Sequence, residues 1–142
     1  MPCWRITERD AYEALCAYTL SRGDPGFIHQ HVVDAFAAQR ADAASKPIGV
    51  TFALVGLFLF VERGWSGKRV QRAHMRLARR PRSWPTLPLP PERGSMTAAD
   101  VMAAPAGAAR DDAVRAWCAE VWAAFAGSRE AIVALLGDEG LL

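Results

Sequence analysis

The hydrophobic pattern of this chain is dominated by one uninterrupted apolar stretch, residues 48–61 (IGVTFALVGLFLFV), in which Thr51 carries the only polar side chain. The stretch is too short to cross a bilayer, which takes about 20 apolar residues in a helix. A helix that is apolar on every side must be covered on every side by other parts of the protein. The pattern therefore predicts a central buried helix surrounded by further helices.

The segments on both sides of this stretch follow the helical period, with apolar residues recurring every three or four positions. Thr97 and Asp100 have the spacing of a capping box at a helix start. Asp24 before Pro25 and Ser66 before Gly67 are expected to cap two further helices. No strand pattern competes with the helices. The helices predicted in this way cover residues 8–21, 25–40, 47–63, 67–80, 98–104 and 109–126, with a last short helix after residue 128.

These elements predict an all-α fold, a single domain over residues 1–142. We expect a helical bundle around the buried helix 48–61, with a C-terminal helical hairpin. Residues 83–95 carry four prolines and therefore form a Pro-rich connection instead of a helix. Trp84 and Leu87 are expected to hold this connection against the body of the protein, although a Pro-x-x-Pro ligand for another domain is the alternative.

Composition narrows the class of protein further. Half of the residues are hydrophobic (51%), which is typical of a globular domain. The first residues lack the apolar run of a signal peptide, so we expect a cytoplasmic protein without a membrane span. The cysteines, Cys3, Cys16 and Cys118, form no Cys-x-x-Cys pair and are odd in number, which argues against a zinc ribbon and a disulfide framework. We expect Cys16 and Cys118 to be small core residues.

Charge is distributed unevenly along the chain, although the net charge is only +2. Residues 63–82 contain Lys68 and seven arginines with no acidic residue, whereas the chain from Glu92 onward is acidic on balance. This separation indicates either an acidic partner or attraction between the two halves of the chain. Glu62 is expected to pair with an arginine of the following helix, such as Arg69.

Histidine is scarce and provides the candidate chemistry. In an up-and-down bundle with a rise of about 1.5 Å per residue, His31 and His74 reach the same height. Two imidazoles with a thiol and a carboxylate match the ligands of a divalent metal such as zinc. The alternative is a pair of neutral core histidines. The candidate ligand set is His31, His74, Cys16 and Asp34, with Glu13 in reserve.

Several segments together resemble a bacterial family of uncharacterised proteins, known only as a domain of unknown function. The most specific are His-Gln-His-Val-Val-Asp-Ala, within residues 27–35, and Val-Gln-Arg-Ala-His-Met at residues 70–75. Val-Glu-Arg-Gly at 61–64, Trp-Pro at 84–85 and Thr-Ala-Ala-Asp-Val at 97–101 add to the resemblance, which spans most of the chain. The resemblance implies no established activity and no cofactor.

Two functions are consistent with these features. The first is binding of a metal ion or small ligand at a histidine site between helices, with or without catalysis. The second is a non-catalytic binding module that uses the basic helix for nucleic acid or an acidic protein. Self-association is left open, and no triad, phosphate-binding glycine loop or His-Glu-x-x-His motif is present. The candidate polyanion-binding residues are Arg69, Arg72, Arg76, Arg79 and Arg80.

Overall fold

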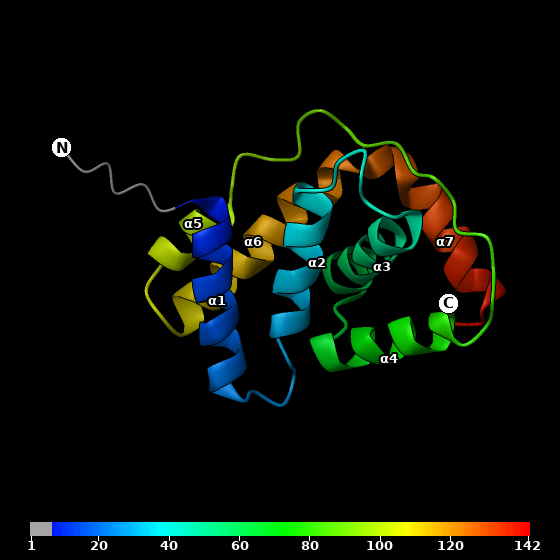
Figure 1. Ribbon diagram of the computed structural model, residues 1–142. Coiled ribbons are helices and arrows are strands. Elements are labelled where there is room, and N and C mark those ends of the chain that lie inside the picture. Colours follow the sequence, from blue (N-terminus) through cyan, green and yellow to red (C-terminus); the bar gives the residue numbers. More distant parts are fainter. Residues whose placement is uncertain (1–6) are drawn as a thin grey trace.

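A computed structural model describes residues 7–142, and all of the regular structure in this range is helical (Figure 1). The all-α prediction is therefore confirmed. None of these helices is long and apolar enough to cross a membrane. The elements are α1 (Glu8–Arg22), α2 (His29–Gln39), α3 (Pro47–Arg63), α4 (Gly67–Ala78), α5 (Ala98–Ala103), α6 (Ala108–Ala124), the 3-10 turn η1 (Ala126–Ser128) and α7 (Arg129–Asp138).

Helix α3 is the buried centre of the molecule, as its continuous apolar sequence predicts. Every residue from position 53 to position 60 is buried, and α2, α4, α6 and α7 all pack against the helix. Pro47 occupies the first turn, where its missing N–H costs no hydrogen bond. Gly64 ends the helix in the left-handed conformation (φ 67°), which glycine adopts without steric cost.

The start of α2 differs from the prediction. Helix 25–40 was expected to begin at Pro25 with Asp24 as its cap, but the observed helix begins only at His29. The Asp24 carboxylate instead accepts a hydrogen bond from the backbone N–H of Ile28 at 2.9 Å. Phe27 lies between them with a φ of 56°, a left-handed conformation that is rare for an aromatic residue. The expected first turn of the helix is therefore an irregular loop.

The second half of the chain lies over the first half in the same order (Figure 1). Helix α5 packs against α1, α6 packs against α2, and α7 packs against α3. The last helix thus turns away from α6 and covers the central helix, so the two C-terminal helices do not pack along each other as a hairpin would. This arrangement supplies the cover that the all-apolar surface of α3 requires.

The Pro-rich connection is held against the body of the protein, as predicted. Trp84 packs edge-on against Phe52 of α3, with ring centroids 5.2 Å apart. The Arg93 guanidinium donates hydrogen bonds to the carbonyl oxygens of Ala38, Gln39 and Ala41 at 2.6–3.1 Å. These carbonyls belong to the end of α2 and the residues after it, where helical partners are missing. Arg93 therefore caps α2 from a distant part of the chain.

Gln39, the polar residue on the apolar face of α2, finds the partners that its burial requires. Its side-chain amide donates to the carbonyl oxygens of Arg93 and Met96, at 3.2 and 2.7 Å. Its side-chain oxygen accepts from the indole N–H of Trp117 at 2.9 Å. One glutamine thus joins α2, the Pro-rich connection and α6.

Candidate functional site: a pocket at His31

The two histidines of the predicted metal site contact different levels of α3. The His31 ring stacks on Phe60 with centroids 3.5 Å apart, and the His74 ring stacks on Phe52 at 4.9 Å. Phe52 and Phe60 are eight residues apart, which is about 12 Å along a helix axis. Equal heights were predicted from an up-and-down arrangement, but α4 lies at a steep angle to α2 (Figure 1).

His74 has the contacts of a core histidine. Its Nε2 lies 2.8 Å from the carbonyl oxygen of Phe52, so this nitrogen donates a hydrogen bond to the backbone. Burial lowers the pKa of His74, which keeps the ring neutral at pH 7. The ring therefore fills the gap between α3 and α4.

The other members of the predicted ligand set are also occupied locally. Cys16 is hydrogen-bonded to Tyr12, and Glu13 lies 3.4 Å from the Arg9 guanidinium. Within residues 7–142, no three His, Cys, Asp or Glu side chains are placed so that they could hold a metal ion. The metal site at His31, His74, Cys16 and Asp34 thus stays a prediction that gains no support from this arrangement.

Asp34 is the most deeply buried acid of the core. Its Oδ1 accepts a hydrogen bond from the Gln30 amide at 3.1 Å, whereas its Oδ2 is buried and finds no hydrogen-bond partner in the part of the chain that the structure describes. Burial raises the pKa of this carboxyl well above its ordinary value. The carboxyl lies directly against Gly56, where a Cβ would overlap Oδ2. Gly56 therefore makes room for Asp34 in the packing of α2 on α3.

The arginines after α3 differ in the contacts that they make. Arg80 and Arg82 bind the carboxylate of Glu139, and Arg76 donates to the Glu139 carbonyl oxygen at 2.7 Å. These contacts agree with one of the two interpretations of the charge pattern, attraction between the two halves of the chain. Arg69 stacks on the ring of Trp65 at 3.7 Å. The exposed basic residues of this segment whose side chains have no hydrogen bond, ion pair or aromatic contact within residues 7–142 are Lys68, Arg72 and Arg79.

Glu62 pairs with a different arginine from the one predicted. Its carboxylate accepts from the Arg129 guanidinium of α7 at 2.7–3.0 Å and from the Trp122 indole N–H at 2.7 Å. Arg69, the expected partner, is directed to Trp65 instead. The reason is the position of α7, which packs on α3 and brings Arg129 to the end of the central helix.

A pocket of about 230 Å³ opens beside His31, and it collects polar groups from four parts of the fold. We call it the His31 pocket. The α1–α2 loop contributes Asp24, the α3–α4 loop contributes Ser66, and α6 contributes Arg115. Phe60 of α3 forms an aromatic wall: His31 stacks on its ring, and the Arg115 guanidinium lies 5.2 Å from the ring centroid. The histidine and the arginine therefore line one pocket and lie near the same aromatic ring.

His31 is the unsatisfied group of this pocket. The residue is 3% exposed, and its Nδ1 is buried with no hydrogen-bond partner among residues 7–142. Burial, together with the positive charge of Arg115, lowers the pKa of His31 to about 4, and the negative charge of Asp24 acts in the opposite direction. The ring is therefore neutral at pH 7. A buried nitrogen without a partner is rare in folded proteins, and it indicates a place where a ligand or water completes the hydrogen bonding.

The charged groups of the pocket are not paired with each other. Within residues 7–142, neither Asp24 nor Arg115 takes part in an ion pair. The pocket thus presents a carboxylate and a guanidinium near one neutral imidazole. The Ser66 hydroxyl is partly committed, because it accepts a hydrogen bond from the Arg69 backbone N–H as the cap of α4.

The loops that form the pocket are fastened together by close backbone contacts. The Lys68 N–H of α4 donates to the Gly26 carbonyl oxygen at 2.9 Å. Gly67 packs so closely against Phe27 that a Cβ at position 67 would overlap the Phe27 carbonyl oxygen. The left-handed Phe27 is part of this arrangement. The loop carrying Asp24 is thus held on the first turn of α4.

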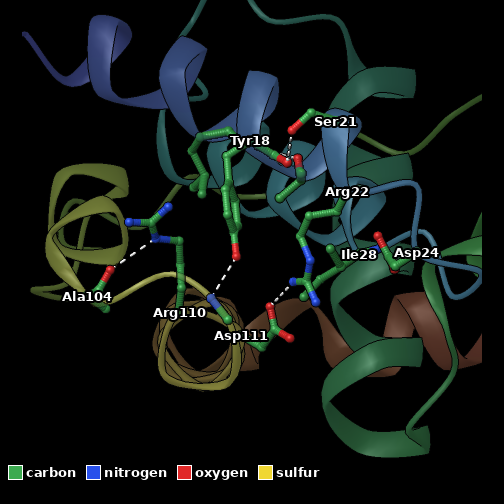
Figure 2. A network of polar contacts seen from close by, with 11 residues as sticks. Tyr18, Ser21, Arg22, Asp24, Ile28, Ala104, Arg110 and Asp111 are labelled. Carbon is green, nitrogen blue, oxygen red and sulfur yellow. Dashed lines mark hydrogen bonds and ion pairs between the residues drawn. The ribbon is translucent and has the colours of Figure 1, made fainter.

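A second set of contacts brings α6 to the same place (Figure 2). Arg22, at the end of α1, forms an ion pair with Asp111 in the first turn of α6. The Tyr18 hydroxyl accepts a hydrogen bond from the Gly107 N–H at 2.8 Å. Figure 2 shows Asp24 on the loop that leaves this junction. Arg115, one helical turn beyond Asp111, is therefore positioned beside the α1–α2 loop.

Another hollow, of about 500 Å³, has a different character. It lies between the end of α2 and the Pro-rich connection, and its lining includes Gln39 and Arg93. Both side chains are already bound to backbone carbonyls there. This hollow is therefore a junction of structural contacts, and we place the candidate site at the His31 pocket.

Sequence patterns identified only part of this pocket. His31 was singled out because histidine is scarce, and Asp24 and Ser66 were noted only as helix caps. Arg115 was missed, because an exposed arginine on an amphipathic helix carries no signal of its own. The unusual conformation of Phe27 was also missed, since Asp-Pro before an apolar segment is a typical helix start.

Comparison with known proteins adds a family but no activity. The model of a family described as a family of unknown function (DUF5946) matches residues 3–126. The match therefore includes every residue of the His31 pocket, and it ends before α7. No curated protein and no solved structure matches the chain. Because the family model covers most of the chain, the protein belongs to this family of unknown function.

Proposed function

We propose that the protein binds a small zwitterionic molecule, such as an α-amino acid, in the His31 pocket. The observation that carries the proposal is the buried Nδ1 of His31, which has no hydrogen-bond partner in the described part of the chain. It lies in a pocket with Asp24 and Arg115, two groups of opposite charge that form no ion pair there. A ligand with one anionic and one cationic group would pair with Arg115 and Asp24 and give His31 its missing hydrogen bond. A volume of about 230 Å³ suits a molecule of this size.

The chemical requirements of the pocket decide the ligand class. A simple anion would be attracted by Arg115 but repelled by Asp24. A simple amine, which is cationic at pH 7, would be attracted by Asp24 but repelled by Arg115. His31 is neutral at pH 7 and so adds hydrogen bonding without adding charge. The aromatic walls, Phe60 and Trp65, favour a ligand with a compact apolar part.

Thermal shift and calorimetry with matched small molecules test this proposal. A panel of α-amino acids should include a member that raises the melting temperature, whereas acetate and methylamine at equal concentration should not. A ligand at a hundredfold excess over its Kd adds about 2.7 kcal/mol of stability, which shifts the melting temperature by several degrees. The proposal fails if no zwitterion binds, or if acetate or methylamine alone reproduces the shift.

Two variants and a matched control locate the binding site. His31→Phe keeps a ring that can stack on Phe60 and removes the unpaired nitrogen, and Arg115→Gln removes the cation. Each should weaken binding about tenfold or more, the effect of losing a hydrogen bond to a charged group. Arg72→Gln removes an exposed arginine outside the pocket and should leave binding unchanged. Equal losses in all three variants would exclude the pocket.

The basic helix is the second candidate function, favoured by the exposed and unpaired side chains of Lys68, Arg72 and Arg79. Arg72→Glu with Arg79→Glu should abolish low-salt retention on heparin if this surface binds a polyanion. Added salt should weaken the retention of the wild type steeply. Arg76 and Arg80 are unsuitable for this test, because both already bind Glu139. The hypothesis is excluded if the wild-type protein is not retained on heparin at low salt.

A further inference from the structure

A second hollow, of about 440 Å³, lies between α1, α2 and the start of α3. Three cationic side chains line it: Arg9 of α1, Arg40 at the end of α2, and Lys46 before α3. None of the described residues lining it is acidic. We call it the basic groove. It shares no lining residue with the His31 pocket, so the two sites are separate.

The floor of the basic groove is aromatic and aliphatic. Tyr12 and Phe36 lie in its lining and stack face to face, with ring centroids 3.8 Å apart and planes 4° apart. The Arg9 guanidinium lies 5.9 Å from both ring centroids. Val33 and Val50 complete the apolar surface. The groove thus combines aromatic and aliphatic side chains with three cations.

The cations of the groove are available to a ligand. Neither Arg40 nor Lys46 has a side-chain hydrogen bond or ion pair within residues 7–142. Arg9 makes one long contact, 3.4 Å to Glu13, in which both side chains are mostly exposed. A pair of this kind contributes little and is readily exchanged. Three cations around one groove are a marked local concentration in a chain of net charge +2.

We infer that the basic groove binds an organic phosphate that carries a flat ring, of the size of a nucleoside diphosphate. The phosphate groups would pair with the three cations, and Arg9 and Arg40 can each offer two parallel N–H donors to phosphate oxygens. The ring would lie on the Tyr12 side of the stacked pair, since aromatic rings stack on one another with their faces offset. A volume of about 440 Å³ holds a ligand of this class.

Calorimetry with ADP and its two separated parts tests the inference. ADP should bind at low salt, and adenosine, which has the ring without the charge, should bind at least tenfold more weakly. Pyrophosphate, which has the charge without the ring, should also bind at least tenfold more weakly. The affinity for ADP should fall steeply between 50 and 500 mM salt, because the charges lie at the surface. Absence of ADP binding, or pyrophosphate binding as tightly as ADP, would overturn the inference.

Single variants show which residues of the basic groove bind the phosphate groups and which bind the ring. Arg40→Gln and Lys46→Gln should each weaken ADP binding about three- to tenfold. Arg63→Gln serves as the control, because it alters an exposed arginine that lines neither pocket and is not among the candidate polyanion-binding residues. Tyr12→Leu should weaken ADP but leave the weak binding of pyrophosphate unchanged. Both glutamine variants alter exposed residues, so their folding should match the wild type. ADP binding that is equally strong in Arg40→Gln and Lys46→Gln would overturn the inference.

Discussion

A methyl group added at position 56 should destabilise the protein by about 1 to 3 kcal/mol, the usual cost of overpacking a core. Alanine is a better helix former than glycine by about 1 kcal/mol, so Gly56→Ala would stabilise an unobstructed helix. Here the new Cβ would overlap the Asp34 carboxyl, which is buried on all sides. The carboxyl would have to move and lose its hydrogen bond from Gln30. Urea unfolding of the variant measures the loss.

A double-mutant cycle shows whether the carboxyl is the cause. In the Asp34→Ala background the obstructing atoms are gone, so the same Gly56→Ala change should be neutral or should stabilise by up to about 1 kcal/mol. The coupling between the two positions should therefore exceed about 1 kcal/mol. Gly137→Ala is a suitable control, because nothing lies within 4 Å of the added Cβ there. Additive effects at positions 34 and 56 would contradict the packing described for α2 and α3.

Acidification should remove about 3 kcal/mol of stability through His31 as the pH falls from about 6.5 to about 4. In the unfolded chain a histidine takes up a proton near pH 6.5, whereas burial and the Arg115 charge lower the pKa of His31 in the folded protein to about 4. The contribution of neutral His31 to the free energy of unfolding is therefore fully present above pH 6.5, and it is lost as the pH falls through the pKa of His31 in the folded protein. Urea unfolding of wild type and His31→Phe between pH 4 and 8 should show this difference. Parallel stability curves would refute it.

Asp34 should act in the opposite direction over the same pH range. Burial raises the pKa of its carboxyl above the unfolded value of about 4, so its contribution is fully present below pH 4 and is lost as the pH rises. Asp34→Asn removes this titration, so the stability of the variant should fall less than that of the wild type as the pH rises. The two effects partly cancel in the wild type, and the single variants separate them. An Asp34→Asn curve parallel to that of the wild type would show that the carboxyl does not titrate differently in the folded state.

The elements of this fold could be predicted well because each helix has its own local signals. The continuous apolar stretch 48–61 could only be a buried helix, and the Thr97–Asp100 capping box marked the start of α5. The exception was α2, whose apparent start at Asp24-Pro25 became a loop. There the backbone is determined by tertiary contacts, including the Lys68 N–H bound to the Gly26 carbonyl oxygen, which the local sequence does not reveal.

The candidate site could be predicted less well, because a site depends on how helices cross. Counting residues along parallel helices placed His31 and His74 level, whereas their ring contacts lie about 12 Å apart along α3. The same count could not place Arg115, which reaches His31 only because α6 packs on α2. Crossing angles follow from the shapes of whole helix faces, and a single periodic pattern does not specify them.

The matching order of the two halves has a consequence for how the chain folds. Hydrogen bonds join Glu8 to Ala98, Gln39 to Trp117 and Glu62 to Arg129, across 90, 78 and 67 positions of sequence. Closing the longest of these loops costs only about 0.3 kcal/mol more chain entropy than closing the shortest, because the cost grows with the logarithm of length. No pair is therefore strongly favoured to form first. Once one pair has formed, the loops that the other pairs still have to close are shorter, so closing them costs less chain entropy. The entropy of closing such long loops is spent largely once, so the two halves should gain their mutual contacts together, after the local helices have formed.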